Sequence, residues 1–417
     1  MAVTLTWTVK IGPIVAPTDF TNRVLGFDLD QQLQLNTVGS FRATITLKNT
    51  DGALTPNGGG TYQSVDWFAQ GVFLRANVSA LGQVKTFDGI ITGFDLFDDG
   101  EYSTVTLTVD DVWTVGGRSL QGTVAAIASQ APSTYISNTA TYGQFSAGFP
   151  FTNPGTTTYT SAVDITAITT TQVTSTATAT GVTYADLLNQ IVMPSQNGFM
   201  WPSKLDAPTD TYIEALLVGS SMTKSAAYRR TFVFDPPSAI SGTDLPITAL
   251  RQGWNTDQTI NTATQTSLDQ PFGAIPITAT DTTATGKYGS RAVTFNQTAC
   301  PAGTVTSVVT ELVNRFKTPT FGPIEVTLTA SSVKAYCANA ADQALADLLD
   351  FNYGFLDKAI ITWTGAGAAS QTANCVILGK RIRATPSDTE IVLSLGKWAD
   401  FHSFILDTDK LDTDRLG

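Results

Sequence analysis

The sequence is poor in the side chains that enzymes most often use for proton transfer and metal binding. It contains one histidine, His402, and three cysteines, Cys300, Cys337 and Cys375, in 417 residues. Catalysis by a serine–histidine or cysteine–histidine pair is therefore excluded away from His402, and a histidine-based zinc site is not expected. His402 is predicted to be a surface or interface residue. The cysteine spacing fits neither a zinc ribbon nor a disulfide framework, which predicts buried free thiols.

Charge is also scarce, and positive charge is the scarcer sign. Charged residues make up 14% of the chain, the formal net charge is −11 and the isoelectric point is near 4.5. Phosphate contacts need clustered lysine and arginine, so a nucleic-acid-binding surface is not expected. Lys380, Arg381 and Arg383 form the one compact basic group. On a strand Arg381 and Arg383 point the same way, and we expect them to pair with acidic residues of another subunit.

Long hydrophobic runs are missing. No stretch reaches the roughly 18 apolar residues of a membrane span, so no membrane span is expected. Residues 1–10 lack the basic start and apolar core of a secretory signal. We therefore expect the protein to be made in a cytoplasm and to reach its final place by assembly.

Acidic residues gather at a predicted hairpin that contains Asp95, Asp98, Asp99 and Glu101. Glycosidases use a pair of carboxylates, which makes this cluster a candidate catalytic site. A turn rich in aspartate and glycine accounts for the same residues without any catalysis. The structural interpretation is favoured.

A second acidic group, Asp407, Asp409, Asp412 and Asp414, has a spacing similar to that of calcium ligands, but the central glycine and closing glutamate of an EF-hand are missing. A solvated acidic tail or a docking strip is expected there. Residues 57–60, Asn-Gly-Gly-Gly, lack the lysine and hydroxyl residue of a phosphate-binding loop and are predicted to be a flexible loop. No catalytic, cofactor-binding or metal-binding residue is therefore assigned, and no enzyme activity or cofactor is expected.

Alternation of apolar and polar residues dominates the first part of the chain. Strands are predicted near residues 3–11, 27–29, 41–47, 72–81, 87–97 and 105–109. Turns at 49–52 and 98–100, rich in asparagine, aspartate and glycine, connect some of them. Residues 1–115 are therefore predicted to form an antiparallel β-barrel or sandwich.

The pattern loosens in residues 116–245, which contain a threonine-rich stretch, a helix that begins at Thr183 with Asp186 in capping-box position, and a strand that begins Gly198-Phe199-Met200-Trp201. This part is predicted to be an α+β insertion domain. Residues 336–400 contain an alanine-rich helix at 338–349 and strands at 359–364, 375–382 and 390–395, which predicts a C-terminal β-barrel. Residues 401–417 form an acidic tail.

Residues 246–335 are predicted to form a central strand–helix–strand domain. A helical stripe is expected from apolar residues with a period of 3.6: Val305, Val308, Val309, Leu312, Val313 and Phe316. Pro301 precedes the helix and Pro319 follows it. The strands at 292–297 and 324–329 on either side of the helix are expected to belong to one covered sheet.

The order of these units resembles the hub-type minor tail proteins of siphophages, in the tailed-phage tail-tip or baseplate hub family. The resemblance spans nearly the whole chain and depends on the order and spacing of individually weak motifs, namely residues 87–93, 110–113 and 198–201 and the block Tyr288-Gly289-Ser290-Arg291. The C-terminal part departs from the family pattern because residues 379–383 contain no histidine and no tryptophan precedes Ile391. The fold class implied is mainly β with α+β insertions, a multi-domain chain with tail-tube-like antiparallel β-barrels or sandwiches at its N- and C-terminal parts.

The resemblance implies a non-enzymatic virion structural protein of the phage tail tip. Such a hub closes the distal tail tube, joins it to fibre or receptor-binding proteins that attach to the host cell, and opens for DNA ejection. A homotrimer is expected, with the distal tail protein ring, the tape measure protein and a central fibre or receptor-binding proteins as partners. Genomic DNA would pass through the channel without specific binding, along a wall that the acidic residues line in part.

Two β-barrels per subunit would let a trimer match a sixfold tail tube. Two alternatives from other classes stay open: a tail-associated carbohydrate-active enzyme (a depolymerase) and a stand-alone carbohydrate-binding adhesin.

Overall fold

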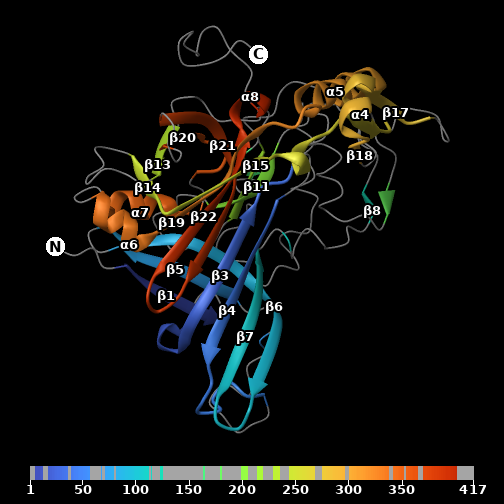
Figure 1. The fold of residues 1–417 in the computed structure, drawn as a ribbon. Coiled ribbons are helices and arrows are strands. Elements are labelled where there is room, and N and C mark those ends of the chain that lie inside the picture. The colour runs from blue at the N-terminus through green and yellow to red at the C-terminus, as the bar shows by residue number, and fades with distance from the viewer. Residues whose placement is uncertain are drawn as a thin grey trace.

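The fold is that of a computed structural model (Figure 1). It describes residues 5–12, 17–35, 39–56, 67, 71–78, 81–111, 114, 123–124, 163–164, 179–180, 199–204, 214–218, 229–234, 244–267, 275–295, 300–337, 341–351, 354–364 and 370–401. Four predictions lie outside these residues: the loop at 57–60, the helix that begins at Thr183, His402 and the acidic group at 407–414.

One sheet of 14 strands organises the molecule. In chain order its strands are β1 (Leu5–Gly12), β2 (Thr18–Asp19), β3 (Val24–Gln32), β4 (Ser40–Lys48), β5 (Gly71–Val78), β6 (Gly82–Asp98), β7 (Ser103–Asp111), β13 (Arg229–Phe234), β14 (Leu245–Ile247), β15 (Ala249–Trp254), β19 (Phe321–Thr329), β20 (Lys358–Thr364), β21 (Ser370–Ala384) and β22 (Thr389–Lys397). Most neighbours are antiparallel, whereas β13 pairs in parallel with both β14 and β20. The prediction of a mainly β chain is confirmed.

Strand β4 follows the period of two that its sequence predicts. In β4 the side chains of Phe41, Ala43, Ile45 and Leu47 are all fully buried, while the residues between them are more accessible. The long strands β6 and β7 form the predicted hairpin, in which Asp98 is paired with Ser103. Alternation therefore identified the strands and the face that β4 buries, whereas β5 and residues 86–91 of β6 are buried on both faces.

Strand β21 pairs the C-terminal part of the chain with its N-terminal strands. Its first half pairs with β20, and its second half lies between β22 and β3, with Ala384 opposite Phe27 and Gly379 opposite Gln32. A Cβ at Gly379 would overlap the side-chain amide of Gln32, which would have to move to make room for it. Strands from the predicted units 1–115 and 336–400 thus form one continuous sheet. The unit boundaries themselves stay a prediction.

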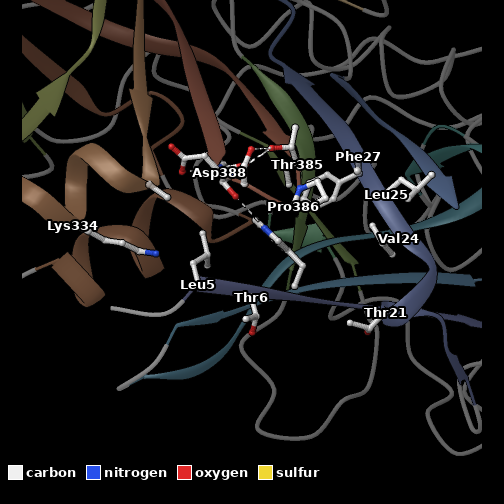
Figure 2. Close-up of a pocket in the computed structure, with 16 residues that line it drawn as sticks. Leu5, Thr6, Thr21, Val24, Leu25, Phe27, Lys334, Thr385, Pro386 and Asp388 are labelled. Carbon is white, nitrogen blue, oxygen red and sulfur yellow. Dashed lines mark hydrogen bonds between the residues drawn. The ribbon is translucent and has the colours of Figure 1, made fainter. Parts of the chain in front are cut away.

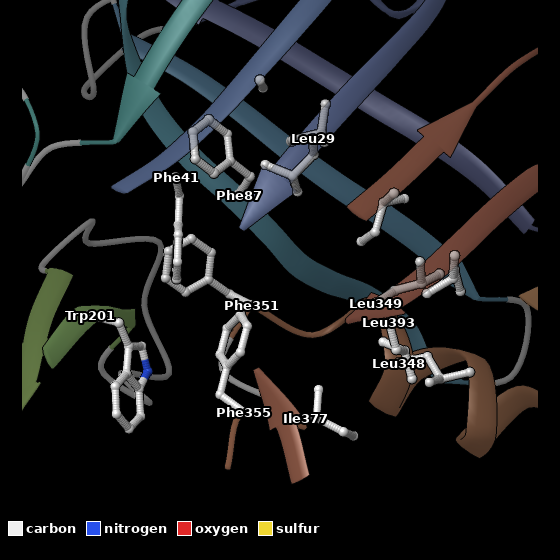
Figure 3. Close-up of a cluster of buried hydrophobic side chains, with 14 of the residues drawn as sticks. Leu29, Phe41, Phe87, Trp201, Leu348, Leu349, Phe351, Phe355, Ile377 and Leu393 are labelled. Atoms are coloured by element: carbon white, nitrogen blue, oxygen red, sulfur yellow. The ribbon is translucent and has the colours of Figure 1, made fainter. Parts of the chain in front are cut away.

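An aromatic cluster fills the space beneath this junction (Figure 3). The ring of Phe351 lies 5.6 Å from that of Phe41 and 6.3 Å from that of Phe87, measured between centroids. Phe355 stacks on Phe41 at 5.4 Å and approaches Trp201 at 6.3 Å. Residues from three predicted units, at positions 41, 201 and 351, therefore share one core.

The central block contains the predicted helix and one helix that was not predicted. Helix α5 (Ala302–Phe316) buries the six predicted stripe residues. Helix α4 (Thr282–Tyr288) begins after Asp281, whose side chain accepts a hydrogen bond from the Ala284 amide, and ends at Gly289 with φ 75°. The segment from Ala284 to Tyr288, for which no helix was predicted, is thus helical.

The expected strand–helix–strand sheet is wrong. Strand β18 (Ala292–Thr294) belongs to a separate three-stranded sheet with β16 (Thr262–Gln265) and β17 (Ile277–Thr280), which α5 covers. Strand β19 belongs instead to the large sheet, between β15 and β22. Helix α5 therefore covers the small sheet and is followed by a strand of the large one.

Short elements complete the description. They are β8 (Thr123–Val124), β9 (Val163–Asp164), β10 (Ala179–Thr180), β11 (Met200–Lys204), β12 (Glu214–Val218), the 3-10 turns η1 (Thr21–Arg23) and η3 (Thr256–Gln258), and the helices α6 (Ala330–Tyr336), α7 (Ala341–Leu349) and α8 (Trp398–Phe401). Helix α7 confirms the predicted alanine-rich helix. The three cysteines are free and buried, as predicted. Within the described ranges, no helix has the length and apolar character needed to cross a membrane.

Candidate functional site

A recess of about 270 Å³ lies where the N-terminal strands meet the turn between β21 and β22 (Figure 2). Its walls come from five places: the start of β1, the turn η1, the start of β3, helix α6, and the turn between β21 and β22. No single stretch of sequence contains more than part of it. The recess exists because β21 brings the turn at residues 385–388 beside the first strands of the chain.

Aromatic contacts form one side of this recess. The rings of Trp7 and Phe27 meet edge to face, with centroids 4.7 Å apart and planes at 84°. Trp7 Nε1 donates a hydrogen bond of 3.1 Å to Thr389 Oγ1, which ties β1 to β22. An edge-to-face pair with a satisfied indole N–H is a rigid wall.

The polar side consists of the turn at Thr385–Asp388 and of Lys334 on α6. Asp388 accepts hydrogen bonds from the backbone N–H of Ser331 at 3.2 Å, from the Ser331 hydroxyl, and from the Thr389 N–H at 2.8 Å. Its carboxylate therefore fastens the start of α6 to the turn. Lys334 is half-buried and, among the described residues, its ammonium has no ion pair or hydrogen bond. The recess is thus lined by one cation and one carboxylate that do not form an ion pair with each other.

The acidic cluster at the β6–β7 hairpin builds a turn. Asp98 Oδ1 accepts from the Gly100 N–H at 2.9 Å, and Asp99 Oδ1 accepts from the N–H groups of Glu101 at 3.1 Å and Tyr102 at 2.6 Å. Asp95 is exposed on β6. These contacts support the structural interpretation of the cluster. Within the parts of the chain that the structure describes, no three histidine, cysteine or acidic residues gather in a way that would hold a metal ion.

The expected pairing of the basic group with another subunit is wrong. Arg381 Nε lies 2.7 Å from Asp28 Oδ1 on β3 of the same chain, and Arg383 Nε lies 3.2 Å from Asp28 Oδ2. Arg383 also approaches Glu390 at 3.5 Å. Partial burial opposes ionisation of Asp28, but the hydrogen bonds from Arg381 outweigh it and lower the pKa of this carboxyl. The cluster therefore holds β3 and β21 together.

Lys380 lies on the opposite face of β21 and is 1% exposed. Its ammonium donates to the Asp350 carbonyl at 2.6 Å and lies 5.5 Å from the centre of the Phe355 ring. The alternation of side chains along a strand separates it from Arg381 and Arg383. The basic group of the sequence is thus divided between the surface and the core.

Two buried ionic groups were missed by sequence reasoning. Asp88 is 1% exposed and pairs with Arg75 at 2.5 Å and Lys85 at 2.7 Å. Asp111 accepts hydrogen bonds of 2.7 Å from the N–H groups of Phe41 and Thr114, and burial raises its pKa to about 6. Single charges within β strands carry no signal in the sequence that separates buried from exposed positions. Both groups brace strands and neither opens into the recess.

Comparisons with known proteins define the fold. No protein-family model matches the chain, and no curated protein sequence matches it. A tail protein from Neisseria meningitidis MC58 is similar in structure, with a TM-score of 0.55 and 13% identity over 95% of this chain and 98% of that protein. The 43 kDa tail protein of prophage MuSo2 from Shewanella oneidensis has a TM-score of 0.53 and 12% identity over 96% of this chain and 100% of its own. The chain therefore has the fold of phage tail proteins, as its resemblance to the tail-tip hub family implied.

Proposed function

We propose that the protein is a structural hub of a phage tail tip, which closes the distal tail tube and joins it to fibre or receptor-binding proteins. The observation that carries this proposal is the extent of the structural similarity. Two phage tail proteins are covered over 98% and 100% of their length by 95% and 96% of this chain. Nearly the whole chain thus belongs to the shared fold, so the similarity does not come from one small module.

The proposed mechanism is geometric. Three copies form a ring in which the large sheets of neighbouring subunits meet, and the ring contacts the distal tail protein, the tape measure protein and a central fibre. Ring opening lets the tape measure protein and the genome pass. Acidic residues on the inner wall repel DNA and keep it from binding, because each exposed cation would add a phosphate contact. The protein acts in the virion without an enzymatic step.

A candidate subunit contact lies at the edge strand β15, which among the described strands pairs with β19 alone. Trp254 on β15 and Phe321 on β19 are 61% and 60% exposed, and their rings meet edge to face at 5.7 Å. An open strand edge beside two exposed aromatic rings favours association. We assign the contact between neighbouring copies to this edge.

The decisive experiment is the mass of the purified chain and its place in the particle. Native mass spectrometry should give a trimer, and imaging of virions with this chain labelled should place it at the tail tip. Trp254→Ser should shift the mass toward the monomer, while Leu81→Ser, which also removes an exposed apolar side chain, should not. A hexamer, or a label elsewhere in the particle, would refute the proposal.

Turnover of host-wall polysaccharide is the test of the enzymatic alternative. The purified chain should show none. Measurable turnover that is lost in Asp98→Asn or Asp99→Asn would instead support a depolymerase.

Replacing acidic residues of the inner wall by lysine should slow genome ejection without blocking assembly. A basic inner wall in the assembled ring would contradict the proposed role of the acids.

A further inference from the structure

One side of β1 is open over part of its length. On its other side β1 pairs with β5 from Leu5 to Gly12, but it pairs with β2 only at Lys10 and Ile11. Val9 continues that edge, because its N–H donates to Thr21 Oγ1 at 3.1 Å and its carbonyl accepts from the Phe20 N–H at 2.8 Å.

Backbone groups point alternately to the two sides of a strand. Since the polar groups of Val9 point away from β5, those of Trp7 and Leu5 point the same way. In the part of the chain that the structure describes, these outward N–H and C=O groups of Leu5 and Trp7 have no backbone or side-chain partner. The edge therefore offers two donors and two acceptors in the spacing of an extended chain.

The 3-10 turn η1 is what leaves this edge open. Continued in register, the chain that follows β2 would place Val24 opposite Leu5. Instead it turns at Thr21–Arg23, and Arg23 donates to both carboxylate oxygens of Asp51, at 2.8 and 2.6 Å, on the turn after β4. This ion pair fastens η1 to the end of β4. The gap beside β1 is therefore part of the folded structure.

The recess of Figure 2 lies at this gap. Leu5, Thr6 and Trp7 line one wall, while Leu25 and Pro386 line others. Pro386 has no N–H, so it offers no donor to a strand that enters here. The recess of about 270 Å³ gives the side chains of such a strand a place to pack.

Lys334 sets the charge of the occupant. It lines the recess and, within the described ranges, has no acidic partner. Asp388 also lines the recess, but it forms no ion pair with Lys334, and its two oxygens accept hydrogen bonds from Ser331 and Thr389 instead. A carboxylate in the occupant would pair with Lys334. The open edge strand β15 of a second copy contains Arg251 and no acidic residue, so its charge does not fit.

We propose that the open edge of β1 at Leu5 and Trp7 binds an extended, acidic segment of a partner protein by strand addition, with a carboxylate of that segment paired to Lys334. In this mode backbone hydrogen bonds supply affinity, and the recess and the cation select the side chains. The proposal goes beyond the assembly role above, because it assigns a docking site and the chemistry of its ligand. It does not depend on whether the assembled ring is a trimer.

The probe is a set of fluorescent heptapeptides of alternating valine and threonine, in which glutamate occupies each position in turn. Their anisotropy is measured with the full chain. We expect at least one glutamate peptide to bind. The peptide with lysine in place of that glutamate should have a dissociation constant at least about tenfold higher. Two further versions of the glutamate peptide are N-methylated, one at the odd-numbered and one at the even-numbered amides. Only one of these versions should lose binding, because only one edge of the peptide faces β1.

Variants of the chain locate the site. Lys334→Ala should abolish the preference for glutamate over lysine, whereas Lys287→Ala, on the distant helix α4, should leave it unchanged. Leu5→Pro removes the outward N–H but keeps the pairing with β5, and proline is tolerated at such an edge. It should bind several-fold more weakly than Leu5→Ala, which loses the same side chain and keeps the amide. Circular dichroism confirms that each variant is folded.

Three outcomes overturn the proposal. The first is the absence of binding by every glutamate peptide up to about 1 mM. The second is an unchanged glutamate preference in Lys334→Ala. The third is a change in the number of copies in the oligomer, either on adding the peptide or in the Leu5→Pro variant. That change would assign the edge to a second copy. A label away from the tail tip would refute the assembly role and leave these results intact.

Discussion

Contacts in the large sheet join residues that are far apart in the sequence. Contacts in the smaller unit, made of α5 and strands β16–β18, join residues that are much closer in the sequence. In the large sheet, residues 27–32 pair with residues 379–384, and Phe351 packs against Phe41 and Phe87. The smaller unit is built from residues 262–316 alone. The two meet where the rings of Phe316 and Phe401 lie 5.2 Å apart. The comparison shows that the second unit forms from contacts within one stretch of the chain, whereas the first depends on contacts between the N-terminal and C-terminal parts of the chain.

Phe351→Ala should have the largest effect on stability. The side chain is fully buried between the rings of Phe41 and Phe87, so its removal leaves a cavity in the core shared by both ends of the chain. We expect a loss of about 3–5 kcal/mol in the free energy of unfolding, measured with urea. Phe321→Ala, at a side chain 60% exposed, should change it little. Similar losses in both variants would mean that the shared core is not the main support of the sheet.

Leu312→Ala tests the smaller unit. Leu312 is fully buried on α5, and we expect a loss of about 2–5 kcal/mol. Thr310→Ala, on the exposed face of the same helix, should cost little. As urea is added, amide hydrogen exchange should increase in β16–β18 at a lower concentration than in β3 and β21, because the smaller unit can open without separating the N-terminal and C-terminal parts of the chain. An equal increase in both sheets would show that the two regions unfold together.

Asp400→Asn tests the boundary between the regions through its pH dependence. Burial raises the pKa of Asp400 to about 6, although Lys397 and Arg315 favour the charged form. Between about pH 4 and pH 6 the folded state therefore binds the proton more tightly than the unfolded chain, and the contribution of this group to stability falls as the pH rises. Above that window the charged carboxylate is unfavourable.

The variant should be more stable than the natural chain at pH 7, by on the order of 2 kcal/mol, and the difference should vanish near pH 4. Urea unfolding at several pH values measures it. Asp95→Asn, at an exposed position of the β6–β7 hairpin, serves as the control and should show no such trend. A stability difference that does not depend on pH would contradict the assigned cause.

Asp28→Asn should have the smallest effect. It weakens the ion pairs with Arg381 and Arg383 that connect β3 to β21, but all three side chains are partly exposed. We expect a loss of about 1 kcal/mol or less, which shrinks in 1 M salt. A loss as large as that of Phe351→Ala would show that surface ion pairs, rather than the aromatic core, join the two ends of the chain.

Sequence reasoning succeeded where burial follows a local period and failed where a partner had to be named. It identified α5 and the N-terminal strands because their apolar residues recur at 3.6 or 2 positions. It missed α4, which buries only Ala284 and so has no stripe. The available signal was Asp281, an N-cap residue three positions before Ala284, together with Gly289 after the last turn.

The candidate site was beyond prediction from sequence. Its walls come from β1, η1, β3, α6 and the turn after β21, and none of these has a motif of its own. The partner of Arg381 was also misassigned, because a strand pattern gives the direction of a side chain but not the strand beside it. Asp28 became its neighbour only through the pairing of β21 with β3.

The sequence by itself determined the type of the long N-terminal strands, of β20–β22 and of helices α5 and α7, and the buried face of β4 and α5, because side-chain direction follows backbone geometry within a few residues. Only the tertiary structure decided that both ends of the chain share one sheet, that the basic group is divided between surface and core, and that β1 keeps an open edge beside Lys334. Backbone hydrogen bonds are chemically the same in every strand. The choice among possible neighbours therefore depends on how all the buried side chains pack at once.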